Sequence, residues 1–303
     1  MWFKNLQLYR FTSDFTLDSE TLAEKLISGE FQPCGKRDLS QYGWVPPMGQ
    51  GFDNMVHAAN GYIMVCARKE EKVMPAGAIK ELVNEKASII EAQEDRKLYR
   101  KERETLKEEI IFDALPNAFT RSSHTFAYID PKNGWLVVDA ASPKKAEELC
   151  SYLRETIGSL PVVPPQVIAS PSVIMTQWLR DENVPEDLLL GDECELRESS
   201  EDGSILRCKR QDLSAEEVSA HLDAGKQAYK LALTWDDKFS AILNEDLTLK
   251  RLKFDDTLLD EADDQGAEDA AAKFDADFAI MTLTLARFLP RFLDYFEGEK
   301  RPV

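Results

Sequence analysis

Four cations in the middle of the chain have the spacing of one face of a helix. At about 100° per residue they fall within a stripe about 60° wide, and they are Arg96, Arg100, Arg103 and Lys107. A row of Arg and Lys side chains is how proteins neutralise phosphates, so the stripe favours a polyanionic ligand. The alternative is an ordinary solvent-facing helix, in which Glu104 pairs with Arg100 four residues earlier.

The segment after this helix, residues 114–129, contains no acid, although the whole chain carries a formal charge of −18. Arg121 adds positive charge there, and the neighbouring hydroxyl and amide side chains can donate to phosphate oxygens. Phe119 can stack on a base if it is exposed. The sequence therefore predicts a phosphate-facing loop. In the alternative, the segment is a turn and Phe119 is buried in the core.

A third basic patch is formed by Lys209 and Arg210, followed by Gln211. It lies inside the acidic part of the chain, since residues 181–277 hold 28 Asp and Glu against 11 Lys and Arg, whereas the rest holds 27 against 26. Exposed charges farther apart than about 8–10 Å are largely screened, so an acidic region does not forbid a basic surface elsewhere. The patch either contacts nucleic acid or pairs with acids of another subunit.

Sequence signatures of enzymes are absent: there is no G-x-x-x-x-G-K-[ST], no G-x-G-x-x-G after a strand, no H-E-x-x-H and no G-x-S-x-G. Only three histidines are available for catalysis, and the five cysteines are far apart, which is typical of reduced thiols. Residues 255–277 hold ten acids, which could bind Mg²⁺ but are denser than a metal cage requires. We expect a protein that is not an enzyme and has neither metal nor cofactor.

The pattern of apolar residues predicts an α+β fold. Alternation in residues 3–11 and an apolar run at 61–67 are typical of strands, and residues 17–29 have the pattern of a capped helix. Pro75 and Pro116 bracket a long helical tract that contains two helices or a bent one. The N-terminal part is therefore mixed α/β with a helical insertion.

Four prolines between residues 159 and 172 indicate a domain boundary, and three strand candidates in residues 228–256 indicate an antiparallel meander. We expect three units: a mixed α/β domain, a helical insertion and a C-terminal α+β domain. Their bounds are residues 1–75 with 117–172, residues 76–116, and residues 173–303. No run of 18 apolar residues and no secretion signal is present, so we expect a soluble cytoplasmic protein without a membrane partner.

Several blocks resemble the RdgC family of recombination-associated proteins of bacteria, and the resemblance covers essentially the whole chain. The blocks are "WFKNL", "FQPCG" followed by "GWVPPMG", "ANGYIMVCARKEEK", "LPNAFTR", "SPKKAEELCSYLRETIGSLPVVP", "KRQDLSAEE" with "AGK", "LKRLKF" and "KFDADF".

This resemblance implies a ring-shaped homodimer with a positively lined hole. It also implies a nucleoid protein that binds double- and single-stranded DNA without sequence preference and restrains the RecA recombinase. On the family pattern, Phe119 contacts DNA, and Arg210 with Gln211 lies at a subunit contact that acts as a gate. Arg210 departs from the pattern, because a lysine is also familiar there, and this change could alter the hydrogen bonds of the contact.

We therefore predict a DNA-binding protein that encircles or coats DNA and modulates homologous recombination. Its predicted DNA-binding residues are Arg96, Arg100, Arg103, Lys107, Phe119 and Arg121, and its predicted subunit contact or gate is Lys209, Arg210 and Gln211. The alternative is an acidic protein-interaction module that mimics DNA and binds the recombinase directly.

Overall fold

The computed structural model describes residues 1–181, 183–198, 200, 203–264 and 269–300. The strands in chain order are β1 (Asn5–Phe11), β2 (Ser40–Val45), β3 (Val56–Ala59), β4 (Tyr62–Lys72), β5 (Thr120–Asp130), β6 (Trp135–Val138), β7 (Val162–Val163), β8 (Leu188–Arg197), β9 (Ile205–Lys209), β10 (Gln227–Trp235), β11 (Phe239–Asn244) and β12 (Leu249–Phe254). The helices are α1 (Ser19–Ile27), α2 (Ala76–Glu94), α3 (Arg100–Ala114), the 3₁₀ turn η1 (Leu115–Asn117), α4 (Pro143–Ile157), α5 (Pro171–Asp181), α6 (Glu216–Asp223), α7 (Asp256–Asp264) and α8 (Ala270–Asp294).

All the strands of the described residues belong to one antiparallel sheet. Its order is β2-β4-β5-β6-β1-β12-β11-β10-β8-β9, while β3 pairs with β4 and β7 with β1. The predicted α+β class is confirmed, and so is the meander, because β10, β11 and β12 are consecutive antiparallel neighbours.

Strand β1 joins the N-terminal and C-terminal halves of the sheet. Its first residues pair with β12, with Asn5 opposite Lys250 and Leu6 opposite Leu249. The following residues, 7–10, pair with β6. The start of the chain thus lies in the middle of the sheet, and the halves on either side of the predicted boundary share this strand.

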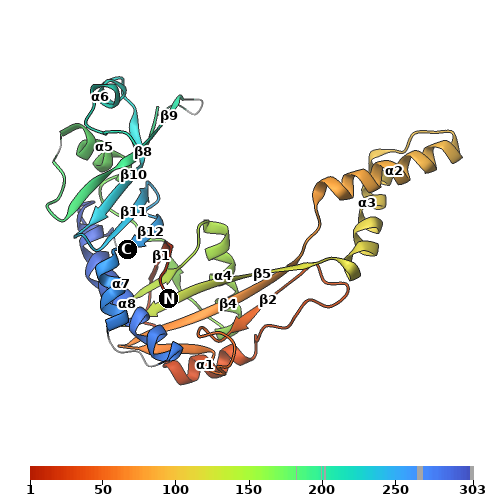
Figure 1. Cartoon of the computed structure of the whole chain (residues 1–303), viewed down its shortest axis with the longest axis horizontal. Helices are drawn as coiled ribbons and strands as arrows, with labels where there is room; N and C mark the ends of the chain where they lie inside the picture. The colour runs from red at the N-terminus through yellow and green to blue at the C-terminus, as the bar shows by residue number, and fades with distance from the viewer. Residues whose placement is uncertain (182, 199, 201–202, 265–268, 301–303) are drawn as a thin grey trace.

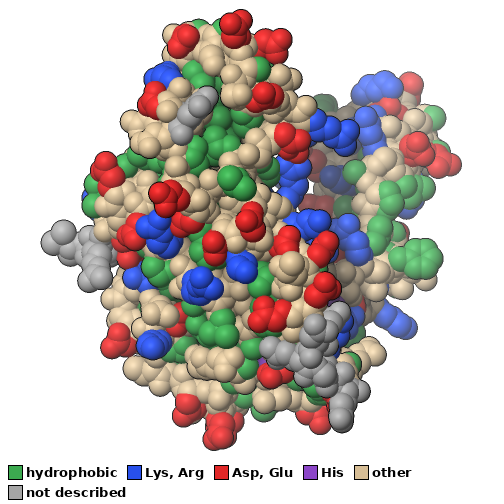
Figure 2. Space-filling view, turned by 60° about the vertical axis from the view of Figure 1, so that its left-hand side comes forward, with side chains coloured by type: hydrophobic (Ala, Val, Ile, Leu, Met, Phe, Trp, Pro, Cys, Tyr) green, Lys and Arg blue, Asp and Glu red, His purple; other side chains and the backbone are tan. Residues whose placement is uncertain are grey.

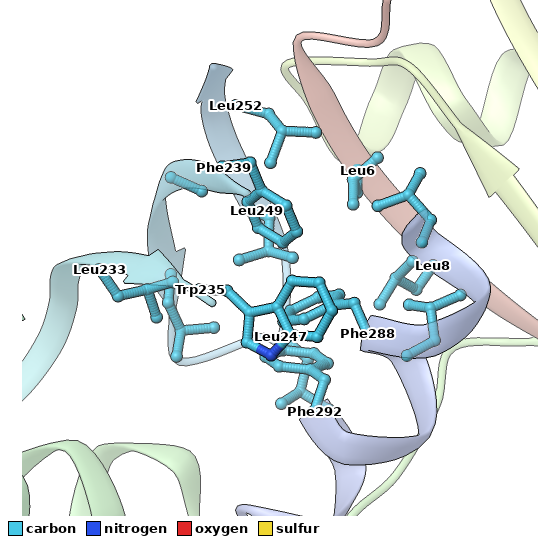
Figure 3. Packing of buried hydrophobic residues seen from close by; sticks show 14 of the residues in the cluster. Leu6, Leu8, Leu233, Trp235, Phe239, Leu247, Leu249, Leu252, Phe288 and Phe292 are labelled. Atoms are coloured by element: carbon cyan, nitrogen blue, oxygen red, sulfur yellow. The ribbon is translucent and has the colours of Figure 1, made fainter. Parts of the chain in front are cut away.

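The larger core lies between the C-terminal strands and helices α5–α8. Trp235 and Phe239 alternate with polar residues along β10 and β11 and point to one face. There both rings pack on Phe288 of α8, with distances between ring centroids of 5.3 and 4.9 Å. Figure 3 shows Leu6 and Leu8 of β1 packing on the same helix. Helices therefore cover one face of β8–β12 and leave the other face open.

A second core packs α1 and α4 on the N-terminal half of the sheet, with Leu22 and Leu149 fully buried. The ends of α4 were predictable from its sequence: Ser142 caps the N-terminus by accepting from the Lys145 backbone N–H, and Gly158 ends the helix with a φ of 91°. These two helices stand on the opposite face of the sheet from α8.

Strands β4 and β5, with β2 along the other edge of β4, extend beyond the rest of the sheet as a three-stranded ribbon that carries α2 and α3. We call the ribbon end together with these helices the arm, and residues 76–116 the tip. The tip helices pack on each other through a small core that includes Ile79 and Leu106. Of the two predicted alternatives, two helices or a bent one, the structure shows two helices, because the chain turns at Asp95.

The chain as a whole has the shape of a crescent (Figure 1). The arm forms one end, and the C-terminal strands with α5 and α6 form the other. We call the concave space between them the hollow. No helix among residues 1–181, 183–198, 200, 203–264 and 269–300 is long and apolar enough to cross a membrane.

Candidate nucleic-acid interface

The predicted basic stripe of the tip does not form. Arg96 lies in the turn between α2 and α3 and not on the helix that carries the other three cations, because Asp95 adopts a left-handed conformation that ends α2. The Arg96 guanidinium pairs with Glu94 and Glu102, both at 2.7 Å. Hydrogen bonds from Arg96 and from the Tyr99 backbone lower the pKa of Glu102 to about 2. This arginine is already neutralised by its neighbours.

Two of the three cations on α3 are also paired. Arg100 contacts Glu104 at 3.1 Å, which is the pair that the alternative interpretation predicted, and Arg103 contacts Glu91 of α2 at 3.2 Å. Lys107 is exposed and has no ion pair with any described residue. The tip holds ten acids against eight cations, so its surface is not basic overall.

Phe119 lies where the ribbon meets the tip, and its side chain is 87% exposed. Its backbone carbonyl accepts from the Val73 N–H at 2.7 Å, which closes the end of the ribbon. The interpretation of Phe119 as a core residue is therefore wrong. An exposed ring held on a strand pair is available to stack on a base or to insert into a groove.

The loop expected around Arg121 is a strand. Strand β4 continues as far as Lys72, and its last residues pair with Thr120 and the residues that follow it, so β5 begins directly after Phe119. Arg121 lies opposite Glu71, with an ion pair at 3.7 Å, and its side chain stays 77% exposed. The ribbon therefore holds Phe119 and Arg121 close together. Arg96 is not part of this group, because it lies in the turn between α2 and α3.

Lys209, Arg210 and Gln211 lie at the end of β9, the edge strand at the other end of the crescent. Arg210 has a φ of 53°, and the Gln211 backbone N–H donates to the Asp192 carbonyl at 3.1 Å. Lys209 and Arg210 are exposed. Their role at a subunit contact stays a prediction.

The open face of β8–β12 carries a cation-rich groove that the sequence analysis missed. Its charged lining is Glu193, Glu195, Arg207, Lys209, Lys230, Lys250 and Arg251. The signal was present in the sequence, because lysines at alternate positions of the meander strands must face away from the core. The groove faces the hollow, since α7 and α8 lie on the outer side of these strands (Figure 1).

Glu195 occupies the centre of this groove and is 4% exposed. It accepts from Arg197, and from Arg207 and Lys230 at 2.9 Å each. Burial alone would raise the pKa of Glu195, but the hydrogen bonds from these three cations lower it to about 2. Arg251 pairs with Glu193. Lys209 and Lys250, by contrast, have no ion pair with any residue that the structure describes.

The N-terminal end of α4 adds two lysines to the hollow. The other end of this helix is fastened near α1, where Tyr152 donates to the Gly29 carbonyl and Trp44 donates to Thr156, both at 3.0 Å. The N-terminal end of α4, which carries Lys144 and Lys145, therefore points into the hollow (Figure 1), and the Lys145 ammonium donates to the His124 carbonyl of β5 at 3.1 Å. Helix N-termini carry a partial positive charge, which reinforces the attraction for anions.

Figure 2 shows how the positive charges are distributed: Lys and Arg side chains gather around the hollow. The lysines of the groove and of the start of α4 come from segments far apart in the chain. The arrangement can attract phosphates from several sides at once.

One of the three histidines and one acid of the acidic segment make structural contacts. His57 contacts Asp275 at 3.1 Å and the rings of Phe274 and Phe278, and burial lowers its pKa. Within the acidic segment, Asp269 caps α8 by accepting from the Ala272 N–H. Among the described residues no group of three or more His, Cys, Asp and Glu side chains could hold a metal ion. Residues 265–268 of the acidic segment lie outside the described residues.

Comparisons with known proteins show to which family the chain belongs. The family model described as "Putative exonuclease, RdgC" matches residues 1–299. A protein of Aeromonas hydrophila named recombination-associated protein RdgC is 47% identical over 303 residues, with all of both chains covered. Proteins of the same name from Tolumonas auensis and Pseudomonas fluorescens are 49% and 46% identical, with at least 99% of each chain covered. The chain belongs to the RdgC family of recombination-associated proteins.

Proposed function

We propose that this protein binds DNA without sequence preference in the hollow of the crescent, and that it modulates homologous recombination by occupying DNA that RecA would otherwise cover. The observation that carries the proposal is the set of cations around the hollow that have no ion pair with a described residue, Lys144, Lys209 and Lys250 among them. Binding requires no chemistry, so we propose that the protein is not an enzyme and acts on the nucleoid DNA of the cytoplasm.

Phosphate contacts explain both the affinity and the lack of sequence preference. Each phosphate neutralised in duplex DNA lowers log K by about 0.9 per tenfold rise in salt. Four lysines of the hollow, Lys144, Lys145, Lys209 and Lys250, therefore predict a slope of about −3 to −4 per subunit. The lysines contact phosphates, which are the same in every sequence. Phe119 adds stacking, which is possible on every base.

We further propose that two crescents close into a ring-shaped homodimer around the DNA. Both ends of the crescent offer contact surface: the tip exposes Leu82, Ile89 and Tyr99, and the opposite end exposes Lys209 and Arg210. A closed ring would place cations of both subunits around one duplex, while the acids on the outside would repel further DNA. Sedimentation equilibrium tests this arrangement, since the proposal requires a dimer and a monomer at micromolar concentration contradicts it.

The central experiment is a titration of labelled DNA at several salt concentrations. Two duplexes and two single strands of unrelated sequence should bind with similar affinities, and the affinity for each should fall steeply with salt. If no DNA binds at low salt and the protein instead binds RecA without DNA, the function is that of an acidic DNA mimic. If labelled DNA is shortened when Mg²⁺ is added, the protein is a nuclease, as the description of the family model suggests.

The effect on RecA is tested by strand exchange with increasing amounts of DNA. Inhibition by occupancy should disappear when the DNA binding sites outnumber the protein. Inhibition that persists in excess DNA would mean that the protein contacts RecA directly.

A further inference from the structure

Two of the five cysteines face each other across neighbouring strands. Cys194 of β8 lies directly opposite Cys208 of β9 in the antiparallel register, and both are free thiols. Cys194 is 5% exposed, whereas Cys208 is half-buried, because β9 is the edge strand of the sheet. Cys34, Cys66 and Cys150 lie on other elements or loops of the N-terminal half.

The register places the two cysteines at a distance that a disulfide can span. The Glu198 backbone N–H donates to the Ser204 carbonyl, so residues 198 and 204 form a hydrogen-bonded pair. Such pairs recur at every second position of a regular ladder, and the register from 197 opposite 205 to 193 opposite 209 is continuous. Cys194 and Cys208 therefore form a hydrogen-bonded pair, in which the Cα atoms are about 5.5 Å apart. Disulfides have Cα separations of roughly 4.4–6.8 Å.

The two thiols differ in reactivity in a way that suits stepwise oxidation. Burial and the neighbouring Cys208 raise the pKa of Cys194, which therefore stays a thiol at neutral pH. Cys208 lies on the edge strand and is less buried than Cys194, so it is the sulfur that a small oxidant reaches first. Cys194 lies next to it and can resolve the product.

We propose that Cys194 and Cys208 are an oxidisable thiol pair that a hydroperoxide converts into a disulfide between β8 and β9. The Cys208 thiolate attacks the peroxide, the O–O bond breaks, and Cys208 becomes a sulfenic acid while the first water leaves. The Cys194 sulfur then attacks the Cys208 sulfur, the S–S bond forms, and the S–O bond breaks with release of the second water. Two thiols lose two electrons and two protons, and one hydrogen peroxide becomes two water molecules.

The disulfide would fasten the edge strand β9 to β8 directly before the predicted subunit contact. Cys208 is followed directly by Lys209, Arg210 and Gln211, so the disulfide would prevent β9 from peeling away from β8 at the end of the crescent. This inference concerns the chemistry of the two thiols and does not depend on DNA binding.

The test is peptide mapping of the full-length protein after treatment with stoichiometric hydrogen peroxide and alkylation in denaturant. The number of free thiols should fall from five to three, and one linked peptide pair should contain Cys194 and Cys208 with a loss of two hydrogens. Cys194→Ala should abolish the link and leave Cys208 as a sulfenic acid that a dimedone probe traps. Cys34→Ser is the matched control, because it removes a half-buried thiol of the N-terminal half and should leave the link intact.

Three outcomes would overturn the proposal. They are five free thiols after treatment, a link that joins two chains and not one, and oxidation of Cys208 to sulfinic acid in the wild type without any link. Because the wild-type protein alone distinguishes all of these, poor folding of a variant would not prevent a decision.

Discussion

The amino group of Met1 and the carboxylate of Asp277 form an ion pair that fastens the start of the chain to α8. The Trp2 indole N–H donates to the same carboxylate at 3.0 Å. Asp277 belongs to the acidic segment, so at least this acid has a definite structural partner. The pair holds β1 at the point where it enters the sheet and joins its two halves.

Asp277→Asn should lower the free energy of unfolding. Removing one partner of a buried ion pair costs about 3–5 kcal/mol, and since the Met1 side chain is 23% exposed we expect about 2–3 kcal/mol here. Urea unfolding followed by tryptophan fluorescence measures the change. Asp294→Asn, at the exposed end of the same helix, is the control and should change stability by less than about 0.5 kcal/mol. Equal effects of the two substitutions would show that Met1 is not anchored.

Glu195 should make stability depend on acid pH. Its pKa is about 2 in the folded protein, below the value of 4.5 usual for a glutamate. The folded state therefore favours the carboxylate, and the resulting stability is present above pH 4.5 and is lost as the pH falls towards 2. We expect a loss of about 1–2 kcal/mol over this window, because the exposed partner Arg207 is screened by water. Urea unfolding of the wild type and of Glu195→Gln at pH 3 and pH 6 measures this contribution: the loss of stability on acidification should be smaller in the variant, although Glu102 contributes to it in both proteins.

Local signals in the sequence were sufficient for several elements of the fold, although not for the strand that begins at Thr120. Alternating apolar residues gave the meander strands, because one face of β10–β12 is covered by helices and the other is open. The ends of α4 followed from Ser142 and Gly158, which act within one turn of the backbone. Such signals depend only on residues nearby in the sequence, so they can be interpreted without knowledge of the tertiary structure.

The candidate site was harder to predict because its parts meet only in the folded chain. Arg103 pairs with Glu91, and this contact exists because α2 and α3 turn back on each other. Periodicity on one helix cannot reveal a carboxylate from another. Likewise, Lys250 and Lys144 reach the same hollow because β12 is placed next to β1 and α4 stands beside it, which no spacing in the sequence encodes.

Phe119→Ala should weaken DNA binding and leave the fold intact. Stacking of one base on an aromatic ring contributes about 1–3 kcal/mol, which corresponds to about 5- to 150-fold in affinity. The side chain is 87% exposed, so the free energy of unfolding should change by less than about 0.5 kcal/mol. Fluorescence anisotropy with labelled single-stranded DNA measures the first effect and urea unfolding the second. Unchanged affinity would remove Phe119 from the interface.

The source of the positive potential can be located by comparing two double variants. Lys144→Gln with Lys250→Gln removes two cations of the hollow that pair with no acid among the described residues. The slope of log K against log salt should become shallower by about 2, since each phosphate contact contributes about 0.9. Arg100→Gln with Arg103→Gln removes two cations of the tip that carboxylates already neutralise, so its slope should stay within about 0.5 of the wild type.

Lys25→Gln on α1, at the convex base of the crescent, controls for the change in net charge and should leave the slope unaltered (Figure 1). The opposite pattern, with a large effect at the tip and none in the hollow, would mean that DNA breaks the ion pairs of Arg100 and Arg103 and binds along α3. In that case the stripe expected from helical spacing would be the binding surface, and the hollow would serve another purpose.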